Sequence, residues 1–155
     1  MSISLRSITK ENWRQCVALQ LGKGQESFVA PNVLSLAQSK FESVRIPLAI
    51  YAGETMVGFI MYNNQPLDDG SYRISRLMID QEHQGKGYGR IAVVEVIERM
   101  RQIPECTEIL VEYSPENVVA AHLYTSLGFE PFGKTEYGTV NGKIDYDIIA
   151  RLRLT

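Results

Sequence analysis

A short glycine-rich segment, from Gln84 to Gly89 (QGKGYG), most strongly limits what this chain of 155 residues can fold into. An apolar, strand-like stretch at 72–80 precedes it, and a stretch at 90–101 with helical spacing of apolar residues follows it. Glycine has no Cβ, so successive glycines let the backbone curl and direct several N–H groups toward one point. The N-terminus of a following helix adds partial positive charge at that point. The segment therefore predicts an anion-binding loop, the alternative being a plain glycine-rich turn.

The spacing of these glycines separates the loop from the common nucleotide motifs. It does not follow G-x-x-x-x-G-K-[ST], the pattern of a nucleotide P-loop, nor G-x-G-x-x-G, the dinucleotide fingerprint. Lys86 and Arg90 add positive charge beside the glycines. A pyrophosphate group is the ligand that such a loop suits best.

The rest of the chain alternates between strand-like and helix-like stretches. We expect strands at residues 3–8, 47–52, 56–63, 72–80, 108–113 and 146–154, and helices at 10–21, 33–43, 90–101 and 118–127. Thr9 is the expected cap of the first helix, and Ile91, Val94, Ile97 and Met100 are the expected apolar positions of the third. Helices between strands, with a hairpin at Gly53, indicate one domain (1–155) of α/β type, an α+β mixed sheet.

Composition excludes several classes of function. The formal net charge is −2, whereas a nucleic-acid-binding domain usually carries a basic surplus. No apolar run is long enough to span a membrane. Cys16 and Cys106 lie far apart, as expected for reduced, partly buried thiols of a cytoplasmic protein. His83 and His122 have no metal-ligand spacing, so we expect no metal.

A second block of residues helps to interpret the glycine-rich loop. It comprises 113–117 (YSPEN), 120–121 (AA), 123–124 (LY) and 127–129 (LGF). Together with the loop, and in the same order along the chain, it resembles motifs A and B of the GNAT superfamily of N-acetyltransferases. The resemblance covers residues 5–154. It implies the GNAT acyl-CoA N-acyltransferase fold, a central, mostly antiparallel sheet flanked by helices, with one splayed strand pair.

The resemblance also implies acetyl-CoA as co-substrate and assigns the residues that hold it. The main chain at 77–79 would pair with the pantetheine arm as an added strand would, and the loop would bind the pyrophosphate. Asn117 either contacts the pantetheine or caps the helix after it, and the two roles are compatible. The donor-binding residues expected on this basis are Leu77, Met78, Ile79, Gln84, Gly85, Lys86, Gly87, Tyr88, Gly89, Arg90, Asn117 and Tyr124.

Two residues are candidates for the chemistry. Tyr124 resembles the family tyrosine that protonates the departing thiolate, the alternative being an aromatic side chain packed beside Phe129. The attacking amine must be neutral, so a base or a water path to one is needed. Glu112, near the end of its strand and expected to face Tyr124, is the candidate base, the alternative being a solvated strand residue. Tyr113 would then point to the opposite face.

The acceptor is indicated by a less specific likeness. Residues 28–32 (FVAPN) and 76–80 (RLMID) resemble bacterial spermine/spermidine (diamine) acetyltransferases of the superfamily, which implies a polyamine substrate. Carboxylates and aromatic walls suit such a cation. The candidate acceptor-binding residues are Glu26, Phe28, Glu42, Asp68 and Asp69. Acetylation of a protein N-terminus, a peptide or an antibiotic is the alternative, and a CoA-binding module without turnover is a second. Relatives often form dimers, so we expect a homodimer in which 146–154 serves as an edge strand.

Overall fold

The computed structural model describes residues 2–154, so both terminal positions of the predicted domain lie outside the described residues. The elements in chain order are β1 (Ile3–Ser7), α1 (Trp13–Ala18), α2 (Asn32–Phe41), β2 (Arg45–Ala52), β3 (Thr55–Asn63), β4 (Ile74–Ile79), the 3₁₀ helix η1 (Gln81–His83), α3 (Tyr88–Arg101), β5 (Glu108–Tyr113), α4 (Val118–Ser126), β6 (Glu130–Val140) and β7 (Lys143–Arg153). None of these helices has the length and apolar character that a bilayer crossing requires.

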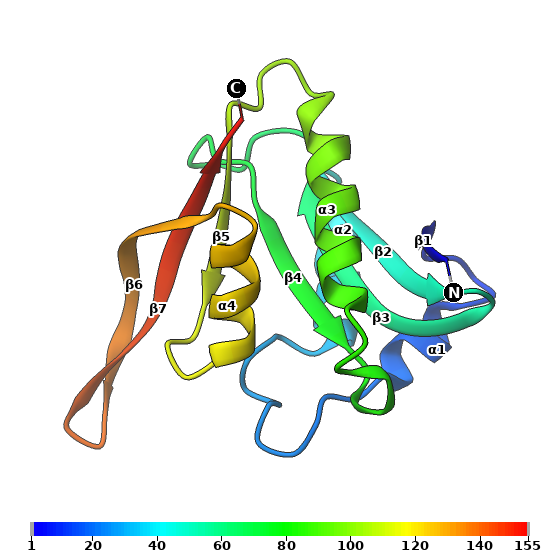
Figure 1. The fold of residues 1–155 in the computed structure, drawn as a ribbon, viewed down its shortest axis with the longest axis horizontal. Helices are drawn as coiled ribbons and strands as arrows, with labels where there is room; N and C mark the ends of the chain where they lie inside the picture. Colours follow the sequence, from blue (N-terminus) through cyan, green and yellow to red (C-terminus); the bar gives the residue numbers. More distant parts are fainter. Residues whose placement is uncertain (1, 155) are drawn as a thin grey trace.

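The strands form two antiparallel sheets, in the orders β1-β2-β3-β4 and β5-β7-β6 (Figure 1). They meet at a parallel bridge between Arg73 and Leu110, where the Leu110 N–H donates to the Tyr72 carbonyl at 2.9 Å. Beyond this bridge β4 and β5 separate, and α4 lies beside the end of β5 (Figure 1). The expected mixed α/β sheet with a splayed strand pair is therefore confirmed.

The first sheet has helices on both faces because its central strands are apolar on both. Along β2, Leu48 and Ile50 pack in the same core cluster as α3 and α4, while Ala49 and Tyr51 pack with Cys16 of α1. Successive strand residues point to opposite faces, so an almost continuous apolar run requires a cover on each side.

The residues that α3 buries against the core are only partly the apolar residues from which the helix was predicted. Ala92, Val93, Val96, Ile97 and Met100 are buried, whereas Ile91 and Val94 are 48% and 42% exposed. A strict three-residue spacing drifts by about 60° per step on a helix of 3.6 residues per turn. Ile91 therefore lies on the opposite side from Met100, although the predicted helix over 90–101 is confirmed.

The N-terminal helix is shorter than its sequence pattern suggests. It begins at Trp13 after Asn12, and the Asn12 Oδ1 accepts from the Thr9 N–H at 2.7 Å. Thr9 is therefore part of the turn before the helix and not its cap. After Ala18 the chain runs without helix or strand until α2, so the expected helix over 10–21 is wrong at both ends.

The C-terminal hairpin corrects the expected edge strand. β7 lies between β5 and β6, and its residues 148–151 pair with both, so most of the stretch 146–154 is not at a sheet edge. The edge belongs to β6, which was not expected. Its apolar pattern is broken by Pro131, Gly133 and Gly138, and its pairing with β7 contains irregularities next to these residues. Bulges of this kind interrupt the period of two by which strands are recognised.

Candidate active site

The space between the diverging strands β4 and β5 is a cleft of about 1560 Å³. The main chain and side chains of β4 line one wall, and the end of β5 with α4 and the β6–β7 hairpin lines the other. Pockets for one small molecule usually measure about 300–1,000 Å³. This cleft therefore has room for two ligands at once.

Two glycines, Gly58 of β3 and Gly89 at the end of the loop, lie against the β4 wall. A Cβ on Gly58 of β3 would lie 2.5 Å from the Met78 carbonyl oxygen, so only glycine lets the two strands approach this closely. A Cβ on Gly89 would lie 3.6 Å from Ile79, at the contact between α3 and the end of β4. Beyond Arg73, β4 pairs with β3 on one edge only. Its other edge faces the cleft and can pair with an extended ligand.

The glycine-rich loop has the geometry that its sequence predicts. Gly85 and Gly87 have φ values of +79° and +82°, and a Cβ on either would meet nothing within 4 Å. Gly87 directly precedes α3, whose first N–H groups have no acceptor within the helix. An open cradle of left-handed glycines before a 14-residue helix fits a pyrophosphate. Arg90, in the first turn of α3, donates to the Ser126 Oγ of α4.

Gln84 turns its side chain away from this cradle. Its Nε2 donates to the Ile79 carbonyl and to the Gln25 Oε1, both at 2.9 Å. The Gln84 side chain therefore holds the loop against β4 and against the segment between α1 and α2.

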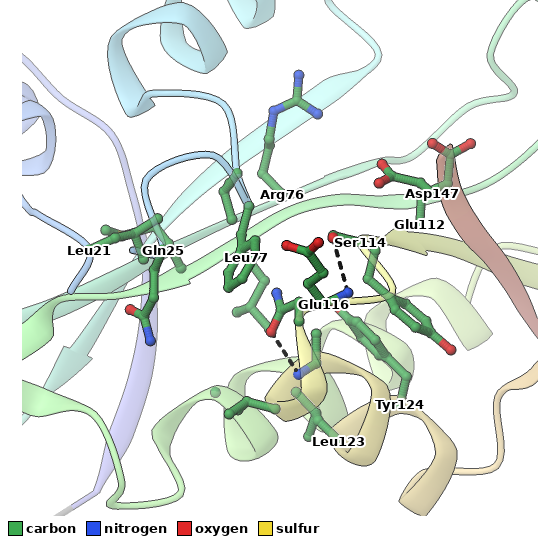
Figure 2. A pocket seen from close by; sticks show the side chains of 18 of the residues that line it. Leu21, Gln25, Arg76, Leu77, Glu112, Ser114, Glu116, Leu123, Tyr124 and Asp147 are labelled. Carbon is green, nitrogen blue, oxygen red and sulfur yellow. Dashed lines mark hydrogen bonds between the residues drawn. The ribbon is translucent and has the colours of Figure 1, made fainter. Parts of the chain in front are cut away.

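Tyr124 rises from α4 into the cleft (Figure 2) and is 5% exposed. Its ring stacks on Tyr113 with centroids 5.8 Å apart and meets Phe129 edge-on at 5.4 Å. Burial, and then the nearby Tyr113, raise the pKa of Tyr124 well above its ordinary value. The phenol therefore keeps its proton at neutral and moderately alkaline pH. Asn117 caps α4, because its Oδ1 accepts from the Ala120 N–H at 3.1 Å.

The strand β5 turns Tyr113, and not Glu112, toward Tyr124. The expectation that Glu112 faces Tyr124 is therefore wrong, and alternation along the strand explains why. Glu112 accepts from Arg73 Nη1 at 2.8 Å, from Thr135 Oγ1 at 3.1 Å and from the Tyr137 hydroxyl at 3.2 Å. It is half-buried and lines the same cleft.

A second carboxylate shares the Tyr137 hydroxyl with Glu112. The Tyr137 oxygen lies 3.2 Å from Asp147 Oδ2, and Figure 2 shows Asp147 and Glu112 next to each other. Partial burial raises the pKa of Asp147, and the charges of Glu112 and Asp145 raise it further against the opposing hydrogen bond from Tyr137. One phenol proton can serve only one carboxylate at a time, so this pair favours a bound cation or proton.

The residues expected to bind the acceptor are dispersed. Phe28 lines the cleft, but Glu26 does not, and its Oε2 accepts from the Gly24 N–H at 2.9 Å. Three other carboxylates line a smaller hollow on the far side of Arg73: Glu42, Asp68 and Asp69. Two of them are paired with arginines, Glu42 with Arg45 at 3.2 Å and Asp69 with Arg73 at 3.1 Å. None of these four carboxylates lines the cleft that contains Tyr124, and their role in acceptor binding stays a prediction.

The residues that the sequence reasoning missed come from the β6–β7 hairpin. Tyr137, Asp145 and Asp147 line the cleft together with Glu112. The available signal was the alternation of two aspartates with Ile144, Tyr146 and Ile148, which marks a strand with one acidic face.

One group of potential metal ligands lies next to the loop. Ligand atoms of Asp80, Glu82 and His83 lie within 4.8 Å of one another. The Asp80 carboxylate already accepts from the N–H groups of Gln20, at 2.8 Å, and Glu82, at 3.3 Å. These contacts hold the turn after β4.

Comparison with known proteins agrees with this geometry. Residues 7–129 match the model of the acetyltransferase (GNAT) family. The chain is 27% identical over 142 residues to a spermine/spermidine N(1)-acetyltransferase of Bacillus subtilis, a match that covers 88% of this chain and 93% of the relative. An uncharacterized N-acetyltransferase of the same organism is 25% identical over 153 residues, covering 92% and 94% of the two chains.

Solved structures share the fold. The spermidine N-acetyltransferase from Vibrio cholerae in complex with CoA and spermine superposes with a TM-score of 0.77 at 19% identity, over 97% of this chain and 95% of that chain. A dodecameric structure of the Vibrio cholerae enzyme gives a TM-score of 0.72 at 19% identity, over 97% and 93%. The family match extends over most of the chain and includes the loop, α3 and α4. The chain therefore belongs to the GNAT family of acetyltransferases and is an N-acetyltransferase with acetyl-CoA as its acetyl donor.

Proposed function

We propose that this enzyme acetylates a primary amine of a polyamine such as spermidine or spermine, by direct attack in a ternary complex. One observation carries the proposal: a row of carboxylates lines the wall of the cleft opposite β4. Asp145 and Asp147 are two residues apart on β7 and so share a face, about 7 Å apart along the strand. Glu112 continues the row on β5, where it pairs with Ile149. Ammonium groups joined by short methylene chains match carboxylates spaced in this way.

The relatives support the same substrate class. The Bacillus subtilis relative is named for spermine and spermidine, and the Vibrio cholerae neighbour was solved with CoA and spermine. A polyamine also fits the polarity of the cleft, since Phe28 and Val29 add apolar surface for methylenes to a cleft that also contains the carboxylates.

Each part of the proposed mechanism has its own residues. The free edge of β4 at Leu77, Met78 and Ile79 and the cradle from Gly85 to Arg90, which includes Lys86, Tyr88 and Gly89, would hold the donor. Asn117 would line the same groove. Acetyl-CoA, when bound, supplies an acetyl group activated as a thioester. Tyr124 donates its proton to the departing sulfur, and its stacking on Tyr113 holds the hydroxyl in place.

The acceptor must lose a proton before it attacks. An alkylamine of ordinary pKa costs about 4.6 kcal/mol to deprotonate at pH 7. Glu112 would hold the ammonium, and Asp147, whose pKa is raised by partial burial, would share with Glu112 the role of base. Tyr137 keeps the two carboxylates together.

Assembly and location complete the proposal. We propose a homo-oligomer in which β6, at the edge of the second sheet, lies at the subunit contact, since a free edge invites pairing with a second chain. We further propose a cytoplasmic enzyme, because Cys16 and Cys106 are buried free thiols.

A screen of CoA release against amines tests the function. Spermidine, spermine, shorter diamines, monoamines, an antibiotic amine and peptides with free N-termini would be compared at equal concentration. We expect kcat/KM to be highest for the polyamines. Turnover of peptides without turnover of spermidine would contradict the substrate class, and protection by acetyl-CoA against heating without any turnover would contradict catalysis.

Neutralising the carboxylate row should weaken polyamine binding selectively. We expect Asp145→Asn to raise the KM for spermidine about threefold to tenfold, while the KM for a monoamine changes less, because Asp145 would bind a distal ammonium group that a monoamine lacks. Glu98→Gln, which removes the same charge from the exposed side of α3, is the control. An equal rise for monoamine and polyamine would contradict the row.

The substitution Asp147→Asn should change how stability depends on pH. Because the folded protein raises the pKa of Asp147, the stability present below the ordinary aspartate pKa is lost as the pH rises through the raised value. Asparagine does not ionise, so Asp147→Asn does not lose this stability as the pH rises. Its unfolding midpoint should exceed that of the parent at pH 7, and the gain should disappear below about pH 4.

A further inference from the structure

We propose that Gln25 is a positioning residue that couples occupancy of the glycine-rich loop to the acceptor side of the cleft. The inference rests on the proposed function, since it requires a donor in the loop and an amine beside Phe28. It concerns the irregular segment 19–31 between α1 and α2, which contains Gln25 and lines the cleft through Phe28 and Val29.

Gln25 and Gln84 form a reciprocal pair of side-chain amides. Gln84 Nε2 donates to Gln25 Oε1 at 2.9 Å, and Gln25 Nε2 donates to Gln84 Oε1 at 3.3 Å. Gln84 Nε2 also donates to the Ile79 carbonyl. One side chain of the glycine-rich loop therefore contacts both the end of β4 and the segment 19–31. Figure 2 shows Gln25 beside Leu21, at the opposite end of the pocket from Glu112.

Within its own segment, Gln25 closes the turn that carries Phe28. Its Oε1 accepts from the Gly22 N–H at 2.9 Å, and its backbone N–H donates to the Gly22 carbonyl at 3.0 Å. The Phe28 N–H donates to the Gln25 carbonyl at 2.9 Å. A displacement of the Gln25 side chain is therefore passed through one turn to Phe28.

A separate anchor keeps the segment attached when Gln25 is changed. The Asp80 carboxylate accepts from the Gln20 N–H at 2.8 Å, and the Gln81 N–H donates to the Gln20 carbonyl at 2.7 Å. Neither contact involves Gln25 or Gln84. Loss of the amide pair therefore removes the coupling, while the segment stays joined to the turn after β4.

The consequence is a mutual effect of the two substrates. A pyrophosphate in the cradle restrains the loop, hence Gln84, and through Gln25 the turn that bears Phe28. A coupling between two binding sites is reciprocal, so the amine must strengthen CoA binding by the same factor by which CoA strengthens amine binding.

Calorimetry of the dead-end complex tests this coupling. The Kd of CoA would be measured with and without saturating spermidine, or the best amine of the screen, for the parent, Gln25→Ala, Gln25→Glu and Lys23→Ala. We expect the amine to tighten CoA at least about fivefold in the parent and in Lys23→Ala, an exposed change in the same turn. In Gln25→Ala the factor should fall below about twofold, with CoA binding alone nearly unchanged and the amine KM raised more than kcat is lowered.

Gln25→Glu separates the two halves of the amide pair. A glutamate still accepts from Gly22 and Gln84 but donates nothing to the Gln84 Oε1, so its coupling factor should be intermediate. If Gln25→Ala does not fold, the coupling factor of Gln25→Glu tests the inference. If a folded Gln25 variant keeps the coupling factor of the parent, or if Lys23→Ala lowers this factor as much as Gln25→Ala does, the inference about Gln25 is overturned. The proposed function is not affected by either result. Failure of CoA to bind the parent protein overturns the proposed function as well.

Discussion

Tyr124→Phe should lower the rate of acetyl transfer by about a hundredfold or more, while CoA binding stays close to that of the parent. A positioned general acid contributes about 10²–10⁴-fold to a rate. The substitution keeps the ring that stacks on Tyr113 and meets Phe129, so the packing of α4 should persist. Single-turnover kinetics are the appropriate measurement, because slow product release would hide a loss in the chemical step.

The pH profile should identify the role of the phenol. Because burial raises the pKa of Tyr124, the acid form persists through the alkaline range in which an ordinary tyrosine ionises. The rate should therefore not fall near pH 10 through loss of this proton. Tyr113→Phe removes the hydroxyl of the stacked partner and is the matched control, expected to stay within about threefold of the parent. Equal single-turnover rates for Tyr124→Phe and the parent would rule out the acid role.

Gly87→Ala should weaken CoA binding about tenfold or more. At φ +82° an L-residue is strained by about 1–2 kcal/mol, and the new methyl group would lie in the open cradle that is proposed for the pyrophosphate. Gly70→Ala is the control, because Gly70 has the same φ of +82° and equally open surroundings, but lies in the turn before β4.

The comparison separates strain from binding. Both variants should lose a similar amount of unfolding free energy, measured by denaturant titration, and only Gly87→Ala should lose CoA affinity in calorimetry. If Gly70→Ala lost as much affinity as Gly87→Ala, or if Gly87→Ala bound CoA as the parent does, the loop would not be the donor site.

Sequence reasoning succeeded where a local pattern and a local structure coincide. The cradle is one example, since the left-handed conformation of Gly85 and Gly87 follows from residue type. β5 is another, because a short apolar run between turn residues is a strand in either sheet. The N-cap role of Asn117 also follows from the residues around it.

The cleft wall opposite β4, with its row of carboxylates, was not predictable in this way, because its parts are distant in sequence. Glu112 meets Asp147 only because β7 pairs with β5 and β6 supplies Tyr137 between them. A hairpin interrupted by Pro131 and Gly138 conceals its register, and register decides which carboxylates share a face. Asp69 shows the converse, since its pairing with Arg73 places it in the neighbouring hollow.

The separation of the two sheets beyond the bridge between Arg73 and Leu110 has a consequence for how such an enzyme can change. On the β4 side the proposed donor contacts are made by main chain, which every residue type provides. On the β5–β7 side the proposed acceptor contacts are made by side chains, which a substitution replaces. Replacing residues of β6 and β7 can therefore produce new acceptor specificities. The proposed use of acetyl-CoA would persist, because it depends on the backbone shape of β4 and on Gly85 and Gly87 of the loop.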